Sequence, residues 1–205
     1  MSQFFRIHPD NPQGRLIRQA VAIVHRGGVI AYPTDSGYAL GCHVGDKAAQ
    51  ERMRRIRQLN EQHNFTLVCR DLSDIGMYAR FDTPVYRLLK KRTPGAYTFI
   101  LTATREVPRR LQHPKRKTVG LRVPDHPITQ ALLTEVGEPL LSTTLILPGE
   151  EEPMNDAEKI RERLQEDVDL VIDGGVCGTI PTTVVDLTDT TPLVLRRGKG
   201  DPSRF

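Results

Sequence analysis

The sequence contains no tryptophan, and only 5% of its 205 residues are aromatic. Proteins that bind single-stranded nucleic acid stack the bases on aromatic side chains, so a platform of that kind is not expected here. The three cysteines, Cys42, Cys69 and Cys177, lie far apart and include no CxxC pair. This spacing supports neither a disulfide framework nor a thiolate metal site, and we expect no protein-bound metal.

Long hydrophobic runs are also missing. The longest stretches without Asp, Glu, Lys or Arg have 12 residues, as in 174–185, whereas a membrane-spanning helix needs about 20 apolar residues. The chain reaches Arg6 after five uncharged residues, which is too few for the apolar core of a signal peptide. No GxxxxGKS/T segment occurs, so P-loop chemistry is not expected. The sequence predicts a soluble, cytoplasmic protein of one domain, 1–205, without a membrane partner.

The net charge of +4 conceals an uneven distribution of charge. Residues 46–122 contain 18 Lys or Arg against 7 Asp or Glu, a balance of +11, whereas residues 124–191 contain 3 against 15, a balance of −12. Solvated helix faces would explain any single basic cluster, but three clusters in one stretch favour an anionic partner, either a polyphosphate or a nucleic acid. The residues we expect to contact RNA phosphates are Arg54, Arg55, Arg109, Arg110, Lys115, Arg116 and Lys117.

The hydrophobic pattern alternates between helical and extended segments. Helices are expected to begin near Asn11, Asp46, Pro84, Pro127 and Asn155, the last through a capping box with Glu158. Strands are expected at 29–32, 65–69, 97–102, 118–123, within 139–147, and at 170–172, 183–187 and 193–196. Several of the late strands follow one another without an intervening helix. The pattern therefore predicts an α/β fold with a mixed parallel and antiparallel sheet flanked by helices.

The segment 32–41, YPTDSGYALG, is the densest in polar chemistry. A strand followed by proline, hydroxyl residues and glycine presents backbone N–H groups and Ser/Thr donors to an anion. An ordinary strand-to-helix loop has a similar composition, so the segment alone does not decide between the two interpretations. Asp35 within it is interpreted either as a turn residue or as a ligand of Mg²⁺ through water.

Segment 32–41 resembles the opening motif of the YrdC/YciO family, PTDTVYGLG. Four more motifs follow in the family's order: PGAYTFIL at 94–101, TVGLRVPDHP at 118–127, DGG at 173–175 with TTVVDL at 182–187, and LRRG at 195–198. The resemblance covers 33–198 and is strongest to the YciO branch. It implies the YrdC-like fold, a twisted mixed sheet with helices around a concave basic surface. Synthases of this family make threonylcarbamoyl-AMP from L-threonine, bicarbonate and ATP for tRNA modification, and members are described as binding double-stranded RNA or tRNA.

The resemblance also implies roles for individual residues. Thr34, Tyr38 and Arg122 correspond to positions that hold the L-threonine substrate, with Thr34 and Arg57 as the catalytic candidates. The positions that hold ATP, with Mg²⁺ accompanying the nucleotide, correspond to Arg57, Ser142, Thr144, Thr182 and Arg196.

Two departures from the synthase pattern qualify this expectation. The synthases' Lys-x-Arg pair is replaced by Arg57-Gln58-Leu59, and their Ser-x-Asn by Ser142-Thr143-Thr144. Losing donors from a catalytic pocket weakens transition-state stabilisation. We therefore expect weak or altered activity: slow synthesis, hydrolysis of the adenylate, or another acyl acceptor. The alternative is a non-catalytic RNA-binding protein that keeps only the basic surface.

Overall fold

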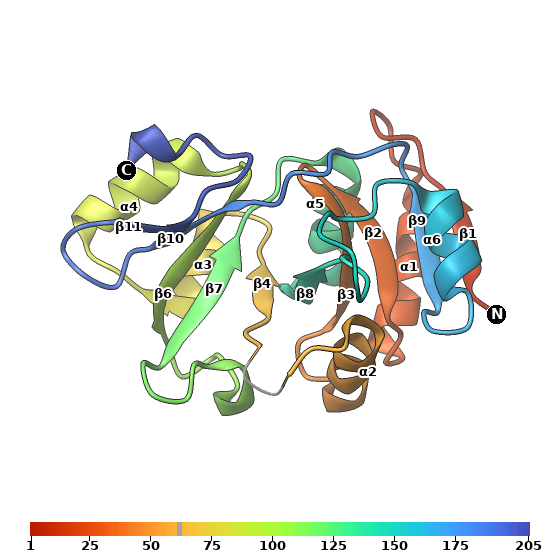
Figure 1. The fold of residues 1–205 in the computed structure, drawn as a ribbon, viewed down its shortest axis with the longest axis horizontal. Helices are drawn as coiled ribbons and strands as arrows, with labels where there is room; N and C mark the ends of the chain where they lie inside the picture. The colour runs from red at the N-terminus through yellow and green to blue at the C-terminus, as the bar shows by residue number, and fades with distance from the viewer. Residues whose placement is uncertain (61–62) are drawn as a thin grey trace.

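The computed structural model describes residues 1–60 and 63–205. In the described part of the chain, one mixed sheet of eleven strands has the order β1-β9-β2-β3-β8-β4-β7-β6-β10-β11, with β5 paired to β6 (Figure 1). The strands are β1 (Gln3–Arg6), β2 (Ile30–Thr34), β3 (Gly37–His43), β4 (Thr66–Val68), β5 (Ala79–Arg80), β6 (Tyr97–Ala103), β7 (Thr118–Arg122), β8 (Leu140–Thr144), β9 (Leu170–Asp173), β10 (Thr183–Asp186) and β11 (Leu193–Arg196).

Parallel and antiparallel pairs are interspersed along this sheet. The pairs β1–β9, β9–β2, β4–β7 and β6–β10 are parallel, and the others are antiparallel. The expected α/β fold with a mixed sheet is therefore confirmed. Of the antiparallel pairs, β2–β3 and β10–β11 are hairpins, whereas β3–β8 and β4–β8 join strands that are far apart in the sequence. Each parallel pair requires a crossover connection.

Helices cover the two faces of the sheet unequally. On one face, α1 (Gly14–His25) and α5 (Pro127–Val136) pack against alternate residues of β2, β8 and β9. The opposite face carries α2 (Lys47–Arg57), α3 (Leu72–Tyr78), α4 (Thr83–Arg92) and α6 (Ala157–Leu164). No helix in 1–60 and 63–205 combines the length and hydropathy needed to cross a bilayer. The part of the sheet formed by β7, β6 and β10 thus has helices packed on only one of its faces.

The connection between β9 and β10 crosses most of the sheet. β9 lies next to one edge strand and β10 next to the other, so residues 174–182 run from one end of the molecule to the other (Figure 1). Because β9 pairs with β2, this segment begins beside the motif on β2 and ends at the motif on β10. This topology brings motifs that are far apart in the sequence to one surface.

The motif at 32–41 is a β-hairpin rather than a strand followed by a loop. β2 continues through Thr34, and β3 begins at Gly37 and pairs with it in antiparallel register. Gly37 has φ +130°, and a Cβ there would lie 2.9 Å from Cβ of Pro153. The glycine is therefore required both by the tight turn and by the close approach of the 148–156 segment. The hydroxyl residues of the motif did not predict the hairpin, because such residues are equally common in loops.

The positions of two helix caps differ from expectation. The first helix begins after Gln13, which makes no side-chain cap, instead of at Asn11. α6 is capped by Asp156, whose carboxylate accepts hydrogen bonds from the N–H groups of Glu158 and Lys159, and not by Asn155. The pattern missed β1, β3, α3 and β5 because these segments are short or carry no clear period.

Candidate functional site

A cavity of about 230 Å³ lies over the central strands of the sheet. Alternation along the strands explains its position. Leu67 and Phe99 point into the core beneath α3 and α4, so their neighbours Thr66 and Thr98 point to the opposite face and line the cavity. This is the part of the sheet that α1 and α5 leave uncovered. Six of the described lining residues carry a hydroxyl group: Thr66, Thr98, Ser142, Thr143, Thr144 and Thr182.

Three arginines from three different elements line this cavity: Arg57 at the end of α2, Arg122 at the end of β7 and Arg196 at the end of β11. None of the described residues that line it is acidic. Burial, and then the nearby charge of Arg122, lower the pKa of Arg196. Like charges held this close in a partly buried site favour the binding of an anion.

Arg122 is the most constrained of the three, with only 7% of its surface exposed. Its Nη2 is ion-paired with Oδ1 of Asp35, and its Nη1 donates to Oγ of Ser36 at 3.1 Å. Both partners belong to the turn of the β2–β3 hairpin. The remaining nitrogen, Nε, is buried and has no acceptor among the described residues. An unsatisfied buried donor costs about 1–3 kcal/mol, and a ligand oxygen that accepted from this Nε–H would remove that cost.

Arg57 and Arg196 are also held by the protein itself. Arg57 donates from Nε to the carbonyl of Ile146 at 2.7 Å and from Nη1 to Oγ1 of Thr143 at 2.9 Å. Arg196 donates from Nε and Nη2 to the carbonyl of Thr182, at 3.2 and 2.9 Å. These bonds fix two guanidinium groups at the cavity without neutralising their charge.

His63 is a lining residue that the sequence reasoning missed. Its Nε2 lies 3.3 Å from Oγ1 of Thr143, which already accepts a hydrogen bond from Arg57. Burial, followed by the charges of Arg57 and Arg54, lowers the pKa of His63 to about 4, so the ring is neutral at neutral pH. The Thr143 hydroxyl accepts from Arg57 and forms a second hydrogen bond with the neutral ring of His63. No sequence signal marked this histidine, because its partners are 6 and 80 residues away.

The hydroxyl groups of the cavity form two internal pairs. Ser142 donates to the carbonyl of Leu40 at 2.8 Å and lies 2.8 Å from the Tyr32 hydroxyl, which must donate to it because the single Ser142 proton is already used. Burial raises the pKa of Tyr32 to about 12, which keeps that proton in place. Thr98 and Thr182 are joined at 2.7 Å. In this arrangement Ser142 offers a ligand an acceptor and not a donor.

Six of the candidate residues therefore lie around one cavity, and two do not. The six are Arg57, Arg122, Ser142, Thr144, Thr182 and Arg196. Thr34 is buried in the hairpin turn, where its hydroxyl donates to the carbonyl of Gly37 at 2.6 Å. Tyr38 is buried as well, and its hydroxyl donates to the carbonyl of Gly175 at 2.9 Å. Their observed contacts hold the hairpin and the 173–175 loop in place.

Leu59, at the position of the synthases' arginine, does not line the cavity. It is half-buried and packs against the hydrophobic cluster under α2. Thr144 does line the cavity, at the end of β8. Of the three changed positions, Arg57 and Thr144 line the cavity and Leu59 does not.

The basic residues expected to contact RNA divide into two groups. Arg54, Arg110 and Arg116 are engaged within the protein; Arg110, for example, donates to the carbonyl of Val44 at 2.7 Å. Arg55, Arg109, Lys115 and Lys117 are exposed. A second, larger concavity of about 660 Å³ brings together Arg80, Arg105, Arg109 and Lys117. No acidic residue in the described chain lines it, so its surface is strongly positive.

The sequence model of the Sua5/YciO/YrdC family, described as "Telomere recombination", matches residues 22–198. This range contains every residue that lines the cavity. The chain belongs to the Sua5/YciO/YrdC family. The resemblance drawn from five motifs is thus confirmed over most of the chain.

Members of the YciO branch are similar over the full length. "Uncharacterized protein YciO" of Escherichia coli strain K12 is 62% identical, with all of both chains covered. The crystal structure titled as E. coli YciO has a TM-score of 0.97 and likewise covers both chains completely. The chain and these relatives therefore share one fold throughout.

The family's synthases are more distant relatives. The threonylcarbamoyl-AMP synthase of Homo sapiens is 32% identical over 84% of this chain and 63% of its own. The structure of P. abyssi Sua5 complexed with L-threonine has a TM-score of 0.88 at 24% identity, covering 96% of this chain and 58% of that one. The first likeness shows that the chain is related to threonylcarbamoyl-AMP synthases, and the second shows a shared fold.

The Asp35–Arg122 pair yields a prediction for stability. Both side chains are about nine-tenths buried, and removing one partner of a buried pair costs about 3–5 kcal/mol because the other charge is left uncompensated. Asp35→Asn should lower the free energy of unfolding in urea by that amount. Glu150→Gln, which breaks the half-exposed pair with Arg163, should cost less than about 1 kcal/mol. Equal losses in the two variants would contradict the role given to Asp35.

Proposed function

We propose that this member of the family binds ATP or AMP in the cavity, with Mg²⁺ accompanying the nucleotide. The observation that carries the proposal is the convergence of three guanidinium groups on a cavity whose described lining residues include no acidic one. There Nε of Arg122 is buried without an acceptor in residues 1–60 and 63–205. Guanidinium groups bind phosphate and carboxylate oxygens in bidentate geometry. A negatively charged ligand with several such oxygens would satisfy all three side chains.

We further propose weak or altered synthesis of threonylcarbamoyl-AMP as the activity. Adenylate formation requires a carboxylate and the α-phosphate of ATP to be held together while their charges are neutralised. Arg122 and Arg196 are suited to the two anions, because their charges are close enough for one to lower the pKa of the other. Arg57 would neutralise charge that develops on the departing pyrophosphate. Thr144 in place of asparagine, and arginine in place of lysine at position 57, are the reasons to expect a slow reaction.

The proposed nucleotide site yields a prediction for ATP affinity. Arg196→Ala should weaken ATP binding about tenfold or more, since a hydrogen bond to a charged group is worth about 1.5–3 kcal/mol. The matched control is Arg109→Ala, an exposed arginine of the larger concavity, which should leave the affinity unchanged. Calorimetry with Mg²⁺ measures both, and thermal unfolding checks that the variants are folded. No binding of ATP at millimolar concentration, or equal losses, would refute the proposal.

The second prediction concerns the reaction. Arg57→Lys combined with Thr144→Asn should raise the rate of ATP–pyrophosphate exchange in the presence of L-threonine and bicarbonate, by about 100-fold or more for a restored donor to the transition state. Adding Leu59→Arg should give no further gain, because that side chain packs against the hydrophobic cluster.

The control for this series is Arg55→Lys with Thr134→Asn, the same exchanges at exposed positions. A wild-type rate equal to that of a standard synthase measured alongside would show that the changed contacts are unimportant. An unchanged rate in the double variant would show that other parts of the cavity limit the reaction.

A second candidate function is binding of double-stranded RNA or tRNA. The concavity lined by Arg80, Arg105, Arg109 and Lys117 supports it. The low aromatic content argues against base stacking, so contacts would be mainly to phosphates and would depend on RNA shape more than on sequence. A non-catalytic RNA-binding protein would need this surface and not the cavity.

RNA binding through this concavity should depend steeply on salt concentration. If about four phosphates are neutralised, log affinity should fall with log salt at a slope of about −3 to −4. Neutralising the four residues of the concavity to Gln should weaken binding of unrelated duplex RNAs alike and reduce that slope. The control exchanges four exposed cations elsewhere, Arg15, Arg18, Arg26 and Lys47, for Gln. Affinity that is independent of salt, or equally reduced by the control, would argue against this surface.

A further inference from the structure

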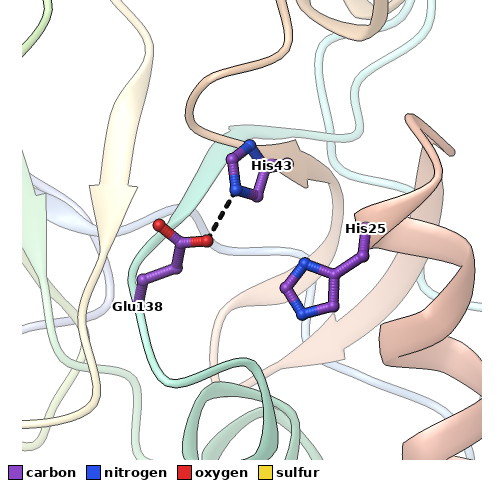
Figure 2. Close-up of side chains that lie close together, drawn as sticks. All are labelled: His25, His43 and Glu138. Carbon is purple, nitrogen blue, oxygen red and sulfur yellow. Dashed lines mark ion pairs between the residues drawn. The ribbon is translucent and has the colours of Figure 1, made fainter.

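Two histidines and a glutamate lie close together (Figure 2). None of the three lines the cavity described above. His25 is the last residue of α1, His43 is the last residue of β3, and Glu138 lies in the turn between α5 and β8. Gly137, with φ +77°, ends α5 in the left-handed conformation and turns the chain toward β8. Three separate elements thus bring these side chains together, although His25 and Glu138 are far apart in sequence.

The donor atoms of the three residues are close enough to share one ion. One ligand atom from each residue lies within 4.8 Å of the other two. Nε2 of His43 is 2.6 Å from Oε1 of Glu138, and the two imidazole rings have centroids 5.9 Å apart. His43 and Glu138 are about one-third exposed, and His25 is exposed. An ion could therefore reach the group from solvent without opening the fold.

We propose that His25, His43 and Glu138 form a binding site for a transition-metal ion, with Zn²⁺ as the ion that fits the donors best. Two imidazoles and one carboxylate are a common three-ligand set for zinc, with water completing a tetrahedron. Imidazole nitrogen also disfavours Mg²⁺ and Ca²⁺, which prefer oxygen ligands. The sequence could not reveal this site, because no short ligand spacing connects the three residues.

The hydrogen bonds of His43 show what metal binding must change. The N–H of Gly45 donates to Nδ1 of His43 at 2.9 Å, so in the neutral ring the proton is on Nε2, which donates to Glu138. Coordination through Nε2 requires the neutral ring to carry its proton on Nδ1. The Gly45 N–H must then release its hydrogen bond. Metal binding should accordingly move the 44–46 turn, which leads directly into α2.

The bound ion would join the end of α1 to β3 and to the α5–β8 turn. His43 lies two residues along β3 from Gly41, where a Cβ would be 2.7 Å from Cε1 of Tyr32. Tyr32 in turn is hydrogen-bonded to Ser142 at the cavity. The proposed metal site is separate from the cavity, although β3 contributes residues to both. The metal proposal does not rest on the proposed nucleotide binding.

Titration of the purified chain with Zn²⁺ alone tests this proposal. We expect one ion per chain, and at least about 100-fold weaker binding in His25→Ala and Glu138→Gln, since even the loss of a group that only supports a metal ligand costs 10–100-fold. His8→Ala, an exposed histidine elsewhere, is the matched control and should bind like the wild type. Co²⁺ should give the visible absorption of a four-coordinate site, and the Gly45 amide resonance should shift on Zn²⁺ binding.

Several results would overturn the assignment. Absence of stoichiometric Zn²⁺ binding to the wild type would do so directly. Binding unchanged in both His25→Ala and Glu138→Gln, or lost in Cys177→Ser, would place the ion elsewhere in the chain. Both substituted residues are at least one-third exposed, and thermal unfolding without metal checks that the variants fold like the wild type.

Discussion

The buried ion pair between Asp35 and Arg122 is the contact on which the rest of the site depends. It joins the turn of the β2–β3 hairpin to the end of β7, across the strands that form the cavity floor. A guanidinium buried to this extent is stable only with a partner and satisfied donors. Asp35 and Ser36 satisfy two of its nitrogens. The third has no acceptor among the described residues, so the proposed ligand would contact a residue that also holds the fold together.

The same contact determines the electrostatics of the cavity. Asp35 compensates Arg122, but no described carboxylate lining the cavity compensates Arg57 or Arg196. Backbone carbonyls of Ile146 and Thr182 hold these two arginines in fixed positions. Fixed, partly buried positive charge attracts anions more strongly than the mobile arginines of an exposed surface. The cavity therefore differs in kind from the larger concavity, whose arginines are exposed.

The sequence predicted the mixed sheet, most of the helices and the family, because hydrophobic periodicity and collinear motifs are local signals. It did not predict which motif residues would face the cavity. Thr34 and Tyr38 belong to the best-matched motif, yet the β2–β3 hairpin turns both into the interior. The pairing of β3 with β8, together with the β2–β3 hairpin, decides which way these side chains point, and β3 and β8 are far apart in the sequence. Tertiary contacts also produce three features that the sequence did not predict: the Asp35–Arg122 pair, His63 beside Thr143, and the His25–His43–Glu138 group.

A structure of the chain crystallised with AMP would test the central claim, that this cavity binds an anionic ligand through its arginines, most directly. The account predicts that an oxygen of the nucleotide phosphate lies within hydrogen-bonding distance, about 2.7–3.2 Å, of Arg196, and that Nε of Arg122 gains an acceptor. AMP bound instead among Arg80, Arg105, Arg109 and Lys117, with the cavity arginines keeping their present contacts alone, would contradict it.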